Sequence, residues 1–265
     1  MANGLTLRSS IEGLEGVPNG LDALRDAYSK MQQITDNRGW IFWAGIHGFP
    51  QFRCWHHGRV GNGVDQLPYD LFLPWHRAYL LNFEHTFRDQ NDAASLPWWD
   101  WTSDNSHNVG IPNSYSVAQV NGNDNPLASG PMPAMDPDPA RQTQRGPDDP
   151  GNLPTADQVQ FLLGLGNFGD FSSQLQEVHD NVHVWVGGDM GVIATSAFDP
   201  IFWSHHCMID RIWYLWQLQN GINNIPSDYL DKALAPFPMT VQDVLDINRL
   251  GYDYAQAAVT VDANQ

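Results

Sequence analysis

Two stretches in the second half of the chain decide how this protein folds: VHDNVHVWVGG at residues 178–188 and DPIFWSHHCMID at residues 199–210. In the first stretch, His179 and His183 are four residues apart. On a helix this spacing places both imidazoles on one face, one turn apart. The second stretch carries a further pair of histidines in a segment whose apolar residues recur at helical spacing. Together they predict two helices that direct imidazole nitrogens toward one point.

The histidine pair of the second stretch, His205 and His206, offers the third imidazole. Asp210 follows His206 by four residues, so we expect its carboxylate on the same face, where it would accept the ring N–H that a metal does not use. Three imidazoles with such a partner suit copper, zinc, iron or nickel. The competing interpretation is an ordinary histidine pair on a solvent-exposed helix. The aromatic and aliphatic neighbours favour the metal, because they indicate buried rings, and buried rings need partners.

The composition excludes several classes of function. The chain has 265 residues, enough for one large domain, and we expect residues 1–265 to form a single domain. The net charge of -17 and the pI of about 4.6 argue against nucleic acid and against an anionic membrane as partners. No apolar run has the length of a membrane span, and residues 1–16 lack the pattern of a signal peptide, which predicts a soluble protein. The sequence does not determine its compartment: the protein is either cytoplasmic or exported with a partner.

Periodicity along the chain predicts a mainly α fold, a helical bundle with inward imidazoles and long irregular loops around its mouth. No periodicity is present at 38–63, and the polar residues 103–155 predict long surface loops with a short two-stranded element. The aromatic segment LPWWDWT at 96–102 is expected to pack beside the histidines, as an extended segment. We expect helices over four ranges: 21–33, 73–90, 156–165 with Thr155 as its N-cap, and 240–250.

Helix geometry reduces the number of candidate metal ligands among the histidines in the first half of the chain. His76 and His85 are nine residues apart, about 900° around a helix, so they lie on opposite faces and cannot share one metal. His76 follows apolar residues and is the better candidate, whereas His85 has charged neighbours and is expected to be exposed. His107, within SDNSHN, is also expected in solvent. Three histidines fall in the non-periodic stretch: His47, His56 and His57.

Taken together, six motifs resemble the central domain of the tyrosinases, which are type-3 copper proteins. The motifs are IHG at 46–48, CWH at 54–56, FLPWHRAYLLNFE at 72–84, LPWWDWT at 96–102, HDNVHVWVGGDMG at 179–191 and DPIFWSHHCMIDRIW at 199–213. The resemblance spans roughly residues 40–216. It implies an α-helical bundle around two copper ions that bind O2 between them. By this resemblance the ligands of CuA would be His47, His56 and His76, and those of CuB would be His179, His183 and His206.

The first copper site departs from the pattern of the family. Relatives generally place the second CuA histidine nine residues before the histidine of PWHR, a position that is Leu67 here. An insertion at 58–68 moves the nearest histidines upstream, to His56 and His57. Cys54 and His56 have the Cys-x-His spacing that carries a Cys–His thioether in fungal tyrosinases and molluscan hemocyanins, which favours His56 and leaves His57 as the alternative. Without the thioether, Cys54 would be a small buried hydrophobic residue.

Four further residues are expected to act on the substrate. Relatives with strong monophenolase activity commonly have Asn after the first CuB histidine, and this Asn and a Glu are proposed to hold a water that acts as base. Here the residue is Asp180, and the Glu position falls near Gln176 or Glu177. Asp180 would act as a base, repel a phenolate, or merely face solvent at a helix turn. Ile193 falls at a position where relatives have a residue that borders the entrance above copper. Val184 is apolar where some relatives have Arg.

The resemblance implies a copper-dependent polyphenol oxidase of the catechol oxidase and tyrosinase type. Such an oxidoreductase uses O2 to oxidise o-diphenols to o-quinones, and its substrates extend to o-aminophenols and monophenols. Its partners would be a small phenol, O2 and a helper protein that loads copper. The alternative is a hemocyanin-like O2 carrier; an additional domain covers the coppers of hemocyanins, and none is expected here. A zinc hydrolase or a metal-free bundle is disfavoured, because the chain lacks an H-E-x-x-H pattern and a carboxylate nucleophile.

Overall fold

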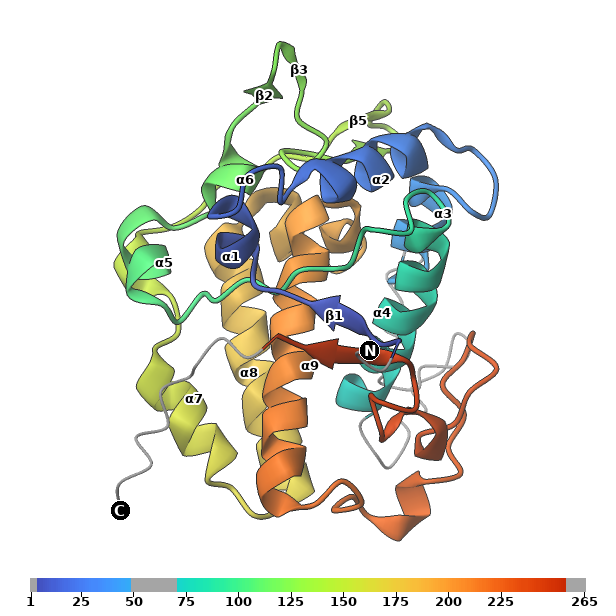
Figure 1. Ribbon diagram of the computed structural model, residues 1–265, viewed down its shortest axis with the longest axis vertical. Helices are drawn as coiled ribbons and strands as arrows, with labels where there is room; N and C mark the ends of the chain where they lie inside the picture. The colour runs from blue at the N-terminus through green and yellow to red at the C-terminus, as the bar shows by residue number, and fades with distance from the viewer. Residues whose placement is uncertain (1–3, 49–70, 256–265) are drawn as a thin grey trace.

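The computed structural model of the protein, which describes residues 4–48 and 71–255, is built around three long helices (Figure 1). Helix α9 (Pro200–Asn220) packs against both α4 (Phe72–Arg88) and α8 (Phe168–Val186), and α4 and α8 also touch each other. This arrangement confirms the predicted mainly α class. None of the helices in the described part of the chain is both long and apolar enough to cross a membrane.

Shorter elements surround the three helices. The remaining α-helices are α1 (Ile11–Glu15), α2 (Asp22–Gln33), α3 (Trp40–Gly45), α5 (Asp104–Val109), α6 (Asn113–Ser116) and α7 (Ala156–Leu163). Single 3-10 turns lie at η2 (Pro150–Asn152), η3 (Gly188–Gly191), η4 (Ser196–Phe198), η5 (Ser227–Tyr229) and η6 (Gln242–Val244). Three two-stranded sheets complete the described elements: parallel β1 (Thr6–Arg8) with β6 (Tyr252–Tyr254), and antiparallel β2 (Gln119–Val120) with β3 (Asn123–Asp124) and β4 (Pro131–Met132) with β5 (Arg141–Gln142).

The sequence explains where the long helices begin and end. The side chain of Asp199 accepts a hydrogen bond from the backbone N–H of Ile201 and caps α9, whose first residue is a proline. From Pro200 to Trp213 every residue of α9 is buried, so this helix forms the centre of the bundle. Helix α8 ends at Gly187, which has φ +63°, a conformation that glycine adopts without strain.

Several predictions of local structure are confirmed. Helices α2 and α4 coincide with the predicted ranges within two residues, and α7 begins with the predicted cap. There, Thr155 and Gln158 form a reciprocal capping box. Of the segment 96–102, residues 96–100 are not helical and Trp98 forms a bridge with Ser10, whereas residues 101–102 form a turn. The segment packs on α9, where the backbone N–H of Trp99 donates to the carbonyl of Ser204 at 3.1 Å.

The predicted helix at 240–250 is wrong, because this segment forms the 3-10 turn η6 and a separate turn at 247–250. The carbonyls of Val244 and Leu245 accept hydrogen bonds from Nη1 of buried Arg77, at 3.1 and 3.2 Å. The N–H groups four residues further on donate instead to the side chain of Asp246. Side chains therefore bind both the carbonyl acceptors and the N–H donors that would form these helical hydrogen bonds, and the helix cannot continue.

The non-periodic stretch at 38–63 also differs from expectation. Its start forms helix α3, and His47 follows this helix directly, while residues 49–63 lie outside the described part of the chain. The predicted surface loops at 103–155 contain two short helices, one 3-10 turn and two antiparallel strand pairs, where one pair was expected. Short polar segments of this kind give too little periodicity for a prediction.

A buried ionic network fastens the ends of the described chain to the bundle. Arg8 on β1 is fully buried and donates to Glu84 at 2.8 Å and to Asp210 at 3.3 Å. Nε of Arg77 donates to Asp210 at 2.5 Å. Burial alone would raise the pKa of Asp210, but Arg77 and Arg8 outweigh it and hold the pKa below its ordinary value. Two hydroxyl groups from β6 also donate to this carboxylate, those of Tyr252 and Tyr254.

We expect Arg77→Met to lower the free energy of unfolding by about 3–5 kcal/mol, because it removes a cation from a buried carboxylate. Urea denaturation measures the change. The control is Arg38→Met, which breaks the exposed pair with Asp36 and should change stability little. Equal losses in both variants would mean that the buried network does not hold α4 against α9.

Candidate metal centre

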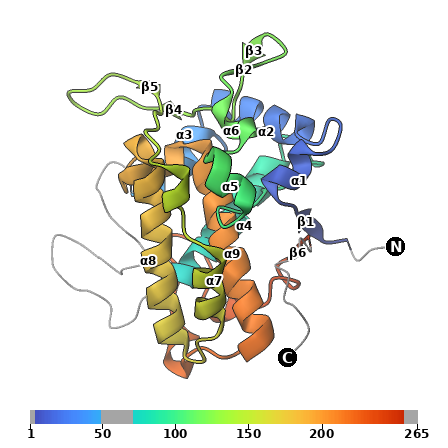
Figure 2. The same cartoon turned by 90° about the vertical axis from the view of Figure 1, so that its left-hand side faces the viewer.

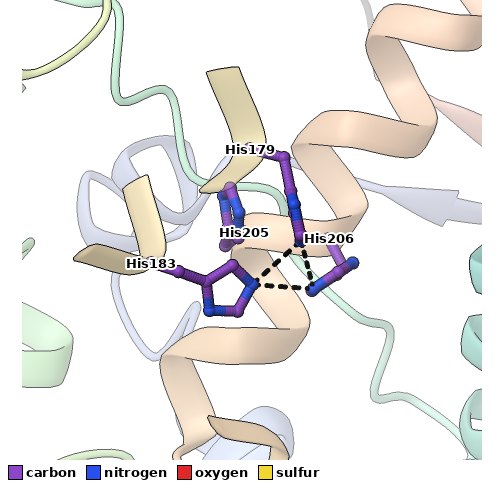
Figure 3. Close-up of side chains that lie close together, drawn as sticks. All are labelled: His179, His183, His205 and His206. Carbon is purple, nitrogen blue, oxygen red and sulfur yellow. Dashed lines mark hydrogen bonds between the residues drawn. The ribbon is translucent and has the colours of Figure 1, made fainter. Parts of the chain in front are cut away.

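Three imidazoles from two helices converge on one point (Figure 3). His179 and His183 lie on α8, and their Nε2 atoms are 2.9 Å apart. Nε2 of His206 on α9 lies 3.2 Å from each of them. The i, i+4 spacing on α8 thus brings its two rings together as predicted, and the second helix supplies the third nitrogen.

Hydrogen bonds on the opposite side of the rings fix which nitrogen carries the proton. Nδ1 of His183 lies 2.8 Å from the carbonyl of Met190, and Nδ1 of His179 lies 2.9 Å from Oδ1 of Asp180. Carbonyl and carboxylate oxygens only accept, so each Nδ1 is the donor and each Nε2 presents a lone pair. Lone pairs this close cannot bond to one another. The donor set therefore fits a cation that accepts electron pairs, as a metal ion does.

A second group of histidines adjoins the first. Nε2 of His47 lies 3.4 Å from Nε2 of His76 on α4. Their Nδ1 atoms face the carbonyls of Ile193 and Phe72, at 3.0 and 2.9 Å, so here too the Nε2 atoms present lone pairs. The rings of His76 and His206 stack with centroids 4.3 Å apart, which joins the two groups. Three residues predicted for the first site lie outside the described part of the chain: Cys54, His56 and His57.

Burial favours the neutral form of four of the clustered imidazoles. It lowers the pKa of His47 from 6.5 to about 4, and it lowers the pKa values of His183, His205 and His206 well below the ordinary range. A histidine must be unprotonated to bind a metal. The burial that removes the proton thus also prepares the nitrogens as ligands at neutral pH.

The role predicted for Asp210 as the acceptor of the His206 ring N–H is wrong. Its carboxylate is drawn instead to the two buried guanidinium groups of Arg8 and Arg77. Nδ1 of His206 has no hydrogen-bond partner within the residues that the structure describes. Two full charges on one carboxylate outweigh a neutral ring N–H.

His205 is fully buried and adjoins the same group of rings. Its ring stacks on that of His179, with centroids 5.1 Å apart, and lies edge-on to that of His183. The ring of Trp101, from the segment 96–102, lies 6.4 Å from that of His205, so the expected position of this segment beside the histidines is confirmed. Of the neighbouring pair on α9, it is His206 whose Nε2 faces the nitrogens of α8.

Two other histidines lie apart from these groups. His85 is exposed on the face of α4 opposite to buried His76, as the spacing predicts. The expectation that His107 lies in solvent is wrong, because this ring is half-buried and its Nε2 lies 3.2 Å from the carbonyl of Pro154. Helix α5 packs on η2 and so covers the ring.

A cavity of about 230 Å³ opens onto both histidine groups and is lined by His47, His179 and His183. Three of the four residues expected near a substrate line it: Gln176, Asp180 and Ile193. Glu177 is exposed and is not among the lining residues. The side chain of Asp180 is 63% exposed, although one of its oxygens accepts the N–H of His179.

Two phenylalanine rings pack against the histidines, a role that the sequence analysis does not assign to either. Phe202 lies 4.8 Å from His47 and 4.1 Å from His206, between the two groups. The ring of Phe72 lies 4.8 Å from that of His179. Each phenylalanine precedes a clustered histidine on its own helix by four residues, so the repeated F-x-x-x-H spacing is a signal that could have found them. The backbone carbonyls that orient the rings leave no such signal.

The family model described as "Common central domain of tyrosinase" matches residues 33–219. A tyrosinase of Streptomyces glaucescens is 30% identical over 201 residues, which cover 67% of this chain and 69% of that one. The "Hemocyanin A-type, units Ode to Odg" of Enteroctopus dofleini is 28% identical over 285 residues. This match covers 94% of the chain but only 22% of the hemocyanin, so the chain spans about a fifth of that relative.

Solved structures of both kinds share the fold. A functional unit of octopus hemocyanin superposes with a TM-score of 0.76 at 26% identity, covering 94% of this chain and 68% of that one. A tyrosinase from Burkholderia thailandensis superposes with a TM-score of 0.78 at 22% identity, covering 98% and 75%. The shared fold extends over nearly the whole chain.

We expect the metal-free protein to lose stability as the pH falls from about 6.5 to about 4. Between these two pH values His47 is protonated in the unfolded protein but not in the folded one. Its contribution to the free energy of unfolding is therefore complete above pH 6.5, decreases as the pH falls, and is lost below about pH 4. Urea midpoints at about pH 7.5 and pH 5 measure the loss, which should be smaller in His47→Gln. The control is the exposed His85→Gln. If His47→Gln keeps the full pH dependence, the buried imidazole is not its source.

Proposed function

Because the chain belongs to the tyrosinase family of type-3 copper proteins, we propose that it is a copper-dependent oxidoreductase that oxidises o-diphenols to o-quinones with O2. One observation carries the proposal: a cavity lined by His47 from one histidine group and by His179 and His183 from the other. A small substrate in this cavity would reach both groups at once.

We assign one copper ion to each group. The ligands proposed for CuB are His179, His183 and His206. Those proposed for CuA are His47, His76 and a third histidine outside the described residues, His56, with His57 as the alternative and with Cys54 joined to His56 by a thioether. Copper bound there would supply the one-electron change at each metal that a two-electron reduction of O2 requires.

The residues of the chain would orient the phenol. The cavity, at about 230 Å³, exceeds the roughly 150 Å³ that suffices for benzene. Val184 and Ile193 line it and are 72% and 52% exposed, so they form an apolar mouth for the ring. With the ring between them, the hydroxyl groups point toward the histidines. One oxygen of Asp180 accepts the N–H of His179, and its second oxygen, which has no hydrogen-bond partner among the described residues, would accept a phenolic proton.

The hemocyanin relatives support a second candidate function, reversible O2 binding with no substrate. The same two histidine groups would serve it. The cavity favours the oxidase, because a carrier needs room for O2 alone and gains nothing from an apolar mouth that admits a ring. Monophenols and o-aminophenols are further substrates that we propose for the same cavity.

We expect the copper-loaded protein to consume O2 with a catechol, and His179→Ala to lose at least 100-fold in rate, on the order of the effect of removing essential groups at an active site. An oxygen electrode measures uptake with a catechol, an o-aminophenol and the matching monophenol. Exposed His85→Ala is the control and should keep full activity. Reversible O2 binding without consumption of any substrate would overturn the oxidase and establish the carrier.

We expect the carboxylate of Asp180 to favour catechols that carry a cation. Asp180→Asn should lower the ratio of kcat/KM for dopamine to kcat/KM for 3,4-dihydroxyphenylacetate by roughly three- to tenfold, the effect of a charge near an exposed site. Glu177→Gln removes an equal charge outside the cavity and is the matched control. A similar change in both variants would mean that net charge, not this residue, selects the substrate.

A further inference from the structure

A single segment forms hydrogen bonds with one histidine of each group. Residues 187–196, here called the carbonyl loop, follow α8 directly. Within this loop the carbonyl of Met190 accepts from Nδ1 of His183 at 2.8 Å, and the carbonyl of Ile193 accepts from Nδ1 of His47 at 3.0 Å. The two carbonyls are three residues apart. A movement of the loop would therefore disturb both histidine groups together.

Two other clustered rings, those of His76 and His179, have hydrogen-bond partners outside this loop. Nδ1 of His76 donates to the carbonyl of Phe72 within its own helix, and Nδ1 of His179 donates to the adjacent Asp180. The carbonyl loop thus orients one histidine per group and leaves these two rings to their own helices. This difference allows its contribution to be measured separately.

One buried side chain fastens the carbonyl loop. Asp189 is 7% exposed and accepts hydrogen bonds from Nη1 and Nη2 of Arg141, at 2.6 and 2.7 Å. It also accepts the N–H of Gln144 at 2.7 Å, while its own N–H donates to the carbonyl of Gln144 at 2.8 Å. Its carbonyl accepts from the hydroxyl of Thr195 at 2.8 Å. Asp189 therefore links the loop to the segment that begins at β5, which Figure 2 places near the upper end of α8.

The backbones of the two segments also touch directly. Gly187 and Gly188 have φ of +63° and +55°. A Cβ atom on Gly188 would lie 2.2 Å from the carbonyl oxygen of Gln144, and one on Gly187 would lie 2.6 Å from that of Gly146. Only glycine permits this approach. The position of the loop is thus set by the segment that carries Arg141.

We propose that Arg141 and Asp189 are positioning residues that orient one ligand of each copper ion through the carbonyl loop. The inference rests on the assignment of copper to the two histidine groups. A fixed carbonyl holds the ring orientation and raises the basicity of Nε2, and losing such a partner typically weakens metal binding about 10- to 100-fold. Because the loop serves His47 and His183 alike, both copper ions are bound less tightly when the pair is broken.

The test is release of copper from the loaded protein to a chelator, with the number of bound ions counted. Wild type should hold two ions, and Asp189→Asn should release both more readily, by at most the roughly 10- to 100-fold that complete loss of the two carbonyl contacts would cost. Arg141→Lys keeps the charge but loses the two-pronged contact, so its effect should be intermediate. Asp36→Asn breaks an exposed carboxylate–arginine pair and is the matched control. The proposal would be overturned if Asp189→Asn released copper as slowly as wild type. It would also be overturned if only one of the two ions were bound less tightly.

A second readout needs no copper. In the metal-free protein, the ring N–H protons of His47 and His183 should exchange faster with solvent in Asp189→Asn and in Arg141→Lys, whereas those of His76 and His179 should not. Nuclear magnetic resonance of nitrogen-labelled protein measures each proton. Equal acceleration at all four rings would indicate general destabilisation and overturn the positioning role. If wild type binds no copper, the proposed function fails, while this comparison still decides whether the pair orients the two rings.

Discussion

Burial of several imidazoles in one apolar bundle is the constraint on which the rest of this structure depends. A neutral imidazole has one donor and one acceptor, and burial without partners is costly for both. Backbone carbonyls receive the N–H groups of His47, His76 and His183, and the lone pairs on the other side are turned toward one another. The arrangement fits a cation among the nitrogens, so the packing that buries the rings also prepares them to bind a metal.

The ionic network around Asp210 fixes the helices that carry the buried rings. Arg77 directly follows His76 on α4, and Asp210 lies one turn beyond His206 on α9. The bond between Arg77 and Asp210 therefore locks the two helices next to the point where the two histidine rings stack. A buried ion pair is weak evidence for stability by itself, but it fixes the register of two helices well. That register sets the distance between the two histidine groups.

Much of this arrangement could be predicted from the sequence, and the failures have a common cause. The long helices and the face shared by His179 and His183 follow from periodicity, which depends only on neighbours along the chain. The partner of Asp210 could not be predicted, because Arg8 lies about two hundred residues away in the sequence and only the fold brings it near. The missing helix at 240–250 has the same origin, since Arg77 of a distant helix takes its carbonyls. Long-range polar contacts overrode local preference in both cases.

The two histidine groups alone do not distinguish an oxidase from a carrier, since relatives of both kinds match this chain. The difference must therefore lie in what reaches the ligands. Here His47, His179 and His183 line the cavity together with Val184 and Ile193, whose aliphatic side chains carry no group that could bind a metal. Val184 and Ile193 leave apolar surface exposed at this mouth, which costs free energy in water unless a ring covers it. The exposed apolar mouth above the histidines therefore supports the oxidase that we propose over simple storage of O2.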